Sequence, residues 1–104
     1  MDKEQVIERV KKYSDTVRQE FDVEKIILFG SYAKDTARED SDIDVAVVVR
    51  NIPGDWLSSS AKLFRLTRDI DINIEPIMID ESHDKSGFLE EVERTGRVIY
   101  QRSA

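Results

Sequence analysis

Apolar residues at steps of three and four mark the first part of the chain. This spacing places their side chains on one face of an amphipathic helix. We therefore predict a helix over residues 2–20 that packs this face against the core. The residues that share the face are Val6, Val10, Tyr13, Val17 and Phe21.

Four shorter apolar segments have the length and composition of strands. Residues 25–29 form an isoleucine-rich run that stops at Gly30, which predicts a short buried strand. Residues 42–49 begin with polar side chains and continue apolar on both faces, so we expect them inside a sheet. Apolar and polar positions alternate in residues 71–79, and residues 97–101 form the last predicted strand.

Helices are predicted between these strands. Ser31 can cap a short helix over residues 31–36, directly after the first strand. A longer helix is expected over residues 55–68, and its aromatic residues Trp56 and Phe64 are assigned to the core.

The last predicted helix covers residues 87–95. It ends at Gly96, a residue type that commonly stops helices in the left-handed conformation. The chain thus alternates helices and strands, and the expected fold class is α/β (α+β), with a small mixed β-sheet covered by helices. Because the 104 residues contain no internal repeat or linker, we expect one domain over residues 1–104.

Composition narrows the range of functions. The net charge is −6 and the sequence pI is near 4.8, which argues against a protein that grips long nucleic acid by its phosphates. A single nucleotide remains compatible, since a bound divalent metal neutralises its charge. The chain has no cysteine and no apolar run long enough for a membrane span, so we expect a cytoplasmic protein.

Two aspartates stand at the start of the second predicted strand. Asp42 and Asp44 are two residues apart, so both side chains lie on one side of a strand. Two ionised carboxylates this close repel each other unless a cation lies between them. The pair suits Mg²⁺, which prefers carboxylate oxygens and keeps open positions for phosphate.

A glycine and a serine precede this pair by ten residues. Gly30 and Ser31 follow the first predicted strand, where they offer backbone N–H groups, a hydroxyl and the start of the predicted short helix. Each of these favours an anion such as a triphosphate. The two elements together suit a nucleotide bound with its metal.

A third carboxylate is expected, either to complete the metal site or to deprotonate an attacking hydroxyl. The polar face of the predicted strand 71–79 offers Asp71 and Glu75. The residues alone leave both candidates open.

Gly30-Ser31, followed ten residues later by Asp42-Ile43-Asp44, resembles the signature of the DNA polymerase β-like nucleotidyltransferases. Nearly the whole chain is similar to the minimal nucleotidyltransferase (MNT) domain of that superfamily. The resemblance implies that Gly30 and Ser31 hold the nucleotide and that Asp42 and Asp44 bind Mg²⁺. It implies Glu75 as the third acid, with a metal-binding and catalytic role.

The same resemblance implies an activity and a partner. The chain is expected to move a nucleoside monophosphate, AMP from ATP, onto a hydroxyl group. Minimal members act as MntA-type antitoxins of HEPN/MNT toxin–antitoxin pairs and AMPylate a tyrosine of a helical HEPN-type toxin. Two alternatives stay open: a nucleotide-binding antitoxin that acts by contact alone, and a nucleotidyltransferase for small molecules, similar to the aminoglycoside enzymes.

Overall fold

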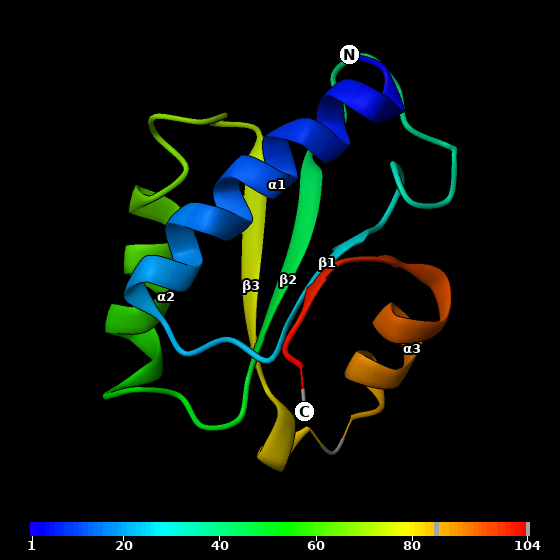
Figure 1. The fold of residues 1–104 in the computed structure, drawn as a ribbon. Helices are drawn as coiled ribbons and strands as arrows, with labels where there is room; N and C mark the ends of the chain where they lie inside the picture. The colour runs from blue at the N-terminus through cyan, green and yellow to red at the C-terminus, as the bar shows by residue number, and fades with distance from the viewer. Residues whose placement is uncertain (85, 104) are drawn as a thin grey trace.

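The computed structural model describes residues 1–84 and 86–103 (Figure 1). No helix among these residues combines the length and the apolar character that a membrane span requires. The elements are α1 (Lys3–Glu20), β1 (Lys25–Phe29), β2 (Ile43–Val49), α2 (Trp56–Arg65), β3 (Ile74–Asp80), the 3₁₀ turn η1 (Glu81–His83), α3 (Phe88–Thr95) and β4 (Arg97–Gln101).

Helix α1 forms as its apolar spacing predicts. A capping box starts it: the Asp2 carboxylate accepts from the backbone N–H of Gln5, and the Gln5 side chain accepts from the N–H of Asp2. The helix ends where Phe21 turns into extended backbone. All five predicted face residues are buried, which confirms the predicted face.

The four strands form one mixed sheet in the order β3-β2-β1-β4. Strand β2 lies between an antiparallel neighbour, β1, and a parallel neighbour, β3. Helix α2 makes the crossover that a parallel pair requires. The position of β2 explains why its residues are apolar on both faces and confirms that prediction.

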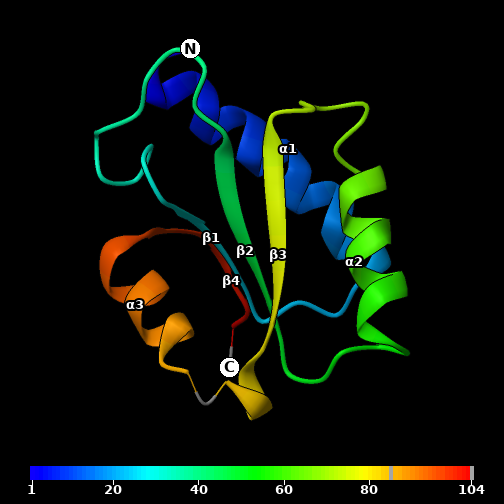
Figure 2. The ribbon, with the colours of Figure 1, turned by 180° about the vertical axis from the view of Figure 1, so that it is seen from behind.

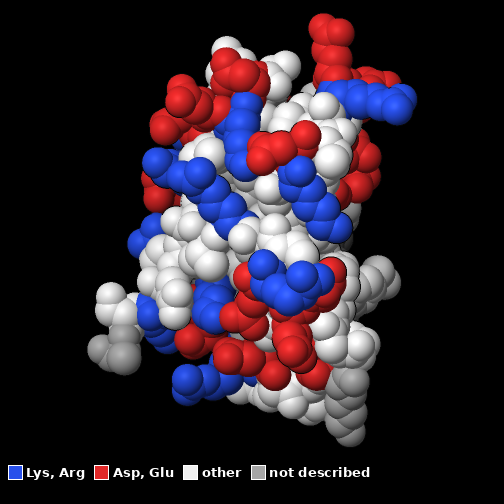
Figure 3. Space-filling view, turned by 90° about the vertical axis from the view of Figure 1, so that its right-hand side faces the viewer, with Lys and Arg blue, Asp and Glu red and all other residues white. Residues whose placement is uncertain are grey.

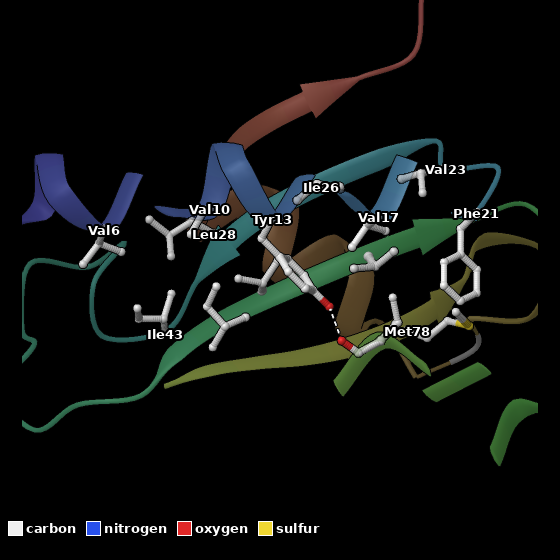
Figure 4. Packing of buried hydrophobic residues seen from close by; sticks show 14 of the residues in the cluster. Val6, Val10, Tyr13, Val17, Phe21, Val23, Ile26, Leu28, Ile43 and Met78 are labelled. Atoms are coloured by element: carbon white, nitrogen blue, oxygen red, sulfur yellow. Dashed lines mark hydrogen bonds between the residues drawn. The ribbon is translucent and has the colours of Figure 1, made fainter. Parts of the chain in front are cut away.

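Helices cover both faces of the sheet (Figures 1 and 2). Helices α1 and α2 pack over the larger core, where the Tyr13 hydroxyl donates a hydrogen bond of 2.8 Å to the Leu63 carbonyl (Figure 4). Helix α3 covers part of the opposite face, where Val92 packs with Ala46 and Val48. This mixed α+β arrangement confirms the expected fold class.

The predicted short helix over residues 31–36 is wrong. These residues form a turn, in which the Lys34 N–H donates to the Gly30 carbonyl and the Thr36 N–H to the Ser31 carbonyl. Asp35 has a φ of 60°, a left-handed conformation that does not continue an α-helix.

The predicted start of the third strand, at residue 71, is also wrong. The Asp71 side chain accepts from the Asn73 N–H at 2.8 Å, and the Asp71 carbonyl accepts from the Ile74 N–H. This turn delays the strand until Ile74 and leaves Ile72 79% exposed. Asparagine and aspartate side chains commonly stabilise turns in this way.

Two further predictions are corrected by the packing. Trp56 and Phe64 are 54% and 51% exposed, because α2 turns Leu63 rather than these rings into the core. Gly96 ends α3 with a φ of −92°, which is not left-handed. A Cβ at Gly96 would lie 2.5 Å from the Val92 carbonyl oxygen, so the glycine permits a close approach instead.

Candidate active site

The candidate site lies where β1 ends and where β2 and β3 begin. The registers place Phe29 of β1 opposite Asp44 of β2, and Asp44 opposite Glu75 of β3. Side chains of directly paired residues lie on the same face of a sheet. Asp44 and Glu75 are therefore neighbours, although 31 positions separate them in the sequence (75 − 44).

This pair lies on the face of the sheet that α3 partly covers. Ala46 and Val48 follow Asp44 at steps of two and pack with Val92 of α3, which fixes the side of Asp44. Figure 2 shows α3 beside the lower part of this face, away from the start of β2 and β3. The carboxylates are thus left at the open end of the sheet, where Glu75 is exposed and Asp44 is half-buried.

Electrostatic repulsion marks the site. The pKa of Asp44 is raised above its ordinary 3.8, first by burial and then by the negative charges of Glu75 and Asp42. In residues 1–84 and 86–103, no three carboxylate, imidazole or thiol groups are arranged closely enough to hold a metal ion as they stand. The three carboxylates nevertheless suit Mg²⁺ by donor type, and a cation among them would relieve their repulsion.

Gly30 is a structural requirement of this arrangement. It follows β1 with a φ of 74°, a left-handed conformation that favours glycine. A Cβ at this position would overlap the Asp44 carboxylate and would lie 3.1 Å from its Cγ. The glycine thus brings the backbone of the Gly30–Ser31 turn directly against Asp44.

The turn does not supply the helix dipole that was expected at Ser31. Residues 31–36 contain no α-helix, so only the local N–H groups and the Ser31 hydroxyl remain as donors to an anion. Gly30 and Ser31 still lie beside the carboxylates, on the β1 side of Asp44.

Asp71 lies away from the pair of Asp44 and Glu75. It precedes β3, its side chain is 4% exposed, and one carboxylate oxygen forms a 2.8 Å salt bridge with Arg9 of α1. Helix α1 covers the face of the sheet opposite to that of Asp44. Of the two candidates for the third acid, the structure therefore brings Glu75, and not Asp71, beside Asp44.

An apolar hollow of about 480 Å³ adjoins the carboxylates, and the sequence analysis missed it. Its lining includes Asp44 and Glu75 of the sheet and Trp56 and Phe64 of α2. The signal was present in the sequence: Trp56, Ser60 and Phe64 recur every four residues, so they form a stripe on α2. The stripe lines a surface hollow and not the core.

Charge near the site is mixed. Figure 3 shows acidic and basic side chains interspersed over the side of the molecule that carries α3. On α3 itself, Arg94 forms a salt bridge of 2.8 Å with Glu91. The single basic residue of α3 is thus engaged by an acidic neighbour.

Comparison with known families gives one match over most of the chain. Residues 11–104 match the family model described as polymerase beta, nucleotidyltransferase.

Two curated proteins of Methanocaldococcus jannaschii are similar in sequence. "Putative protein adenylyltransferase MJ0141" is 32% identical over 96 residues, which cover 88% of this chain and 93% of the relative. "Putative protein adenylyltransferase MJ1305" is 33% identical over 86 residues, which cover 77% of this chain but only 58% of the relative.

Solved structures share the fold at low sequence identity. A "putative nucleotidyltransferase" from Sulfolobus solfataricus has a TM-score of 0.72 at 23% identity, over 96% of this chain and 84% of that one. A toxin–antitoxin structure with AMP-PNP gives 0.68 at 20% identity, over 89% and 74% of the two chains. The complex of a tri-AMPylated Shewanella oneidensis HEPN toxin with its MNT antitoxin gives 0.59 at 18% identity, over 96% and 73%.

Proposed function

This chain belongs to the polymerase beta nucleotidyltransferase family and is a nucleotidyltransferase, and we propose that it transfers AMP from ATP to a protein hydroxyl. One observation carries the proposal: parallel pairing of β2 with β3 sets Glu75 beside Asp44, and the Gly30 turn closes on the same carboxylate. We propose that residues 1–104 act as one catalytic domain.

We propose separate roles for the residues of the site in phosphoryl transfer. The backbone N–H groups at Gly30 and Ser31 and the Ser31 hydroxyl hold the triphosphate. Asp42, Asp44 and Glu75 are the ligands for Mg²⁺, which when bound neutralises phosphate charge and orients the α-phosphate. The position of Glu75 beside the half-buried Asp44, and the raised pKa of Asp44 that follows from burial and from the charges of Glu75 and Asp42, support a cation at this position.

The proposed reaction is a single displacement at the α-phosphorus. The acceptor oxygen forms a bond to the α-phosphorus, the bond from that phosphorus to the bridging oxygen breaks, and pyrophosphate leaves. Glu75 accepts the proton of the attacking hydroxyl. Glu75 is exposed at the open end of the sheet, which gives an acceptor access to it.

The acceptor we propose is a tyrosine of a HEPN-type toxin, with this chain as the antitoxin in the cytoplasm. The similar M. jannaschii proteins are named as protein adenylyltransferases, and one structure of the same fold is an MNT antitoxin with an AMPylated HEPN toxin. Both findings concern those proteins and support the same class of acceptor here.

The test uses the purified chain, ATP labelled at the α-phosphate, Mg²⁺ and a candidate HEPN-type protein. Label should appear on that protein, and both EDTA and Asp44→Asn should remove it. If efficient labelling falls instead on small hydroxyl compounds, the protein acceptor is wrong. If the two proteins bind tightly and no label is transferred, inhibition by contact alone replaces transfer.

A further inference from the structure

The outer edge of β3 carries an elongated apolar depression, here called the β3 groove. It consists of two adjoining hollows of about 480 and 320 Å³. The first begins at Asp44 and Glu75, and the second ends at Asp80 and His83. The residues common to both hollows are Trp56, Ile77, Met78 and Phe88.

The groove passes over an unpaired edge of the sheet. In the described part of the chain β3 pairs with β2 alone, since the strand order is β3-β2-β1-β4. The lining side chains come from both faces of the sheet: Phe64 belongs to α2 on one face, and Phe88 begins α3 on the other. The groove therefore follows β3 lengthwise around its free edge.

The direction of attack assigns this groove to the acceptor. Gly30 and Ser31 lie on the β1 side of Asp44, and Glu75 lies on its β3 side. The attacking and leaving oxygens of phosphoryl transfer are roughly in line, on opposite sides of the phosphorus. With the leaving pyrophosphate at Gly30, the acceptor approaches from Glu75, where the β3 groove begins.

We infer that the β3 groove binds an extended polypeptide segment of the acceptor protein, with apolar and basic side chains around its hydroxyl residue. This inference rests on the proposed transfer to a protein. The hydroxyl residue lies at Glu75, and the flanking residues run along β3 toward His83.

Length favours a polypeptide over a small acceptor. Strand β3 has seven residues, which extend over about 23 Å at the usual rise of a strand. One nucleoside or sugar occupies a single hollow, whereas an extended peptide spans both. Peptides that add to an exposed sheet edge combine main-chain contacts with pockets for alternate side chains.

The lining determines the chemistry of the segment. Trp56, Phe64 and Ile77 are 54%, 51% and 38% exposed, so they present apolar surface that a partner can cover. Charged groups among the described lining residues are acidic apart from His83: Asp44, Glu75, Asp80 and Asp84. A segment with leucine-like and arginine-like side chains complements both features.

Trp56 makes the groove directly observable, because it is the only tryptophan in the chain. The probe is a short N-acetylated peptide with one central tyrosine and leucine and arginine alternating around it. Adding it to the full chain should shift Trp56 emission to the blue and lower acrylamide quenching in a saturable way. The same peptide with serine and glutamate in those positions should do neither.

Two variants and a matched control test the location. Ile77→Glu and Phe64→Ser should each weaken peptide binding about tenfold, as expected for loss of one buried apolar contact. Leu57→Ser removes a comparable exposed side chain of α2 that lies outside the groove, and should bind as the unmodified chain does.

Three outcomes overturn the inference. The first is that Mg²⁺ with AMP-PNP shields Trp56 from the quencher while the peptide does not, which would make the groove a nucleoside site. The second is that a higher protein concentration alone shields Trp56, which would make the groove an interface between two copies of the chain. The third is that neither probe shields Trp56, or that the control variant Leu57→Ser loses as much peptide binding as the two groove variants.

Transfer measured in parallel separates this inference from the proposed function. If the peptide shields Trp56 and no AMP is transferred to any protein, the groove stands and the transferase proposal fails. If AMP is transferred to a HEPN-type protein equally well by Phe64→Ser and the unmodified chain, the transferase proposal stands and the groove fails.

Discussion

Replacing Gly30 by alanine tests the contact between the phosphate turn and the metal site. Gly30 has a φ of 74°, and a Cβ there would lie 3.1 Å from Cγ and 3.3 Å from Cβ of Asp44, with direct overlap of one carboxylate oxygen. Asp44 must therefore leave its position to admit the methyl group. Gly54→Ala is the matched control, because Gly54 has a φ of 69° and nothing within 4 Å of its added Cβ.

The magnitude follows from two separate costs. Left-handed backbone costs a non-glycine residue about 1–2 kcal/mol, and both variants incur it. Displacing a side chain from its rotamer costs about 0.5–1.5 kcal/mol more, and only Gly30→Ala incurs that. We expect a loss in the free energy of unfolding of about 1–2 kcal/mol for Gly54→Ala and about 1.5–3.5 kcal/mol for Gly30→Ala.

Function should separate the two variants more sharply than stability does. Displacement of Asp44 removes a proposed metal ligand, so Gly30→Ala should lower Mg-ATP affinity by at least about tenfold, equivalent to about 1.4 kcal/mol. Gly54→Ala should bind as the unmodified chain does. Urea unfolding and titration calorimetry measure both quantities. Equal Mg-ATP affinity in the two variants would refute the claim that Gly30 positions Asp44.

Further predictions concern the carboxylates and the core. Because its pKa is raised, Asp44 binds a proton more tightly in the folded state, and its contribution to stability falls as pH rises from 3.8 through the raised value. Asp44→Asn should therefore flatten this part of the pH profile of thermal unfolding and abolish stabilisation by Mg²⁺. Glu75→Gln should abolish transfer, since loss of a base acts on the chemical step, and should also weaken Mg-ATP binding, because Glu75 is a proposed Mg²⁺ ligand; transfer at the unmodified rate would contradict its role. Asp71→Asn should keep transfer but lower stability by about 1–2 kcal/mol, because it weakens a charged hydrogen bond to Arg9, as chemical denaturation would show. Tyr13→Phe should cost about 1–2 kcal/mol in the same measurement, since it leaves a buried carbonyl of α2 unpaired.

The sequence predicted those parts of the fold in which local pattern and packing agree. The face of α1 and the buried position of β2 follow from periodicity, and both are as predicted. The failures have two local causes: a bond from the Asn73 N–H to the Asp71 side chain forms a turn before β3, and the left-handed φ of Asp35 prevents the expected helix. Such bonds depend on geometry that spacing does not encode.

The candidate site was predictable in its residue types and not in its pairing. The spacing of Gly30, Asp42 and Asp44 indicated phosphate and metal, but it could not decide between Asp71 and Glu75. Strand register shows which of the two lies beside Asp44, because the parallel pair sets Asp44 opposite Glu75. The groove escaped prediction for a related reason: exposure of Trp56 depends on how α2 is rotated over the sheet.

The place of β3 at the edge of the sheet links catalysis to local unfolding. In the described part of the chain β3 is hydrogen-bonded to β2 alone, whereas β2 is paired on both sides, so the amide protons of β3 should exchange faster than those of β2. When β3 opens, Glu75 separates from Asp44 while β1, β2 and β4 remain paired. If Asp44 and Glu75 act as proposed, the fraction of competent molecules follows this local opening and not the global free energy of unfolding. A polypeptide bound along β3, as we propose for the acceptor, would shift the same equilibrium toward the paired strand and so help to order the site.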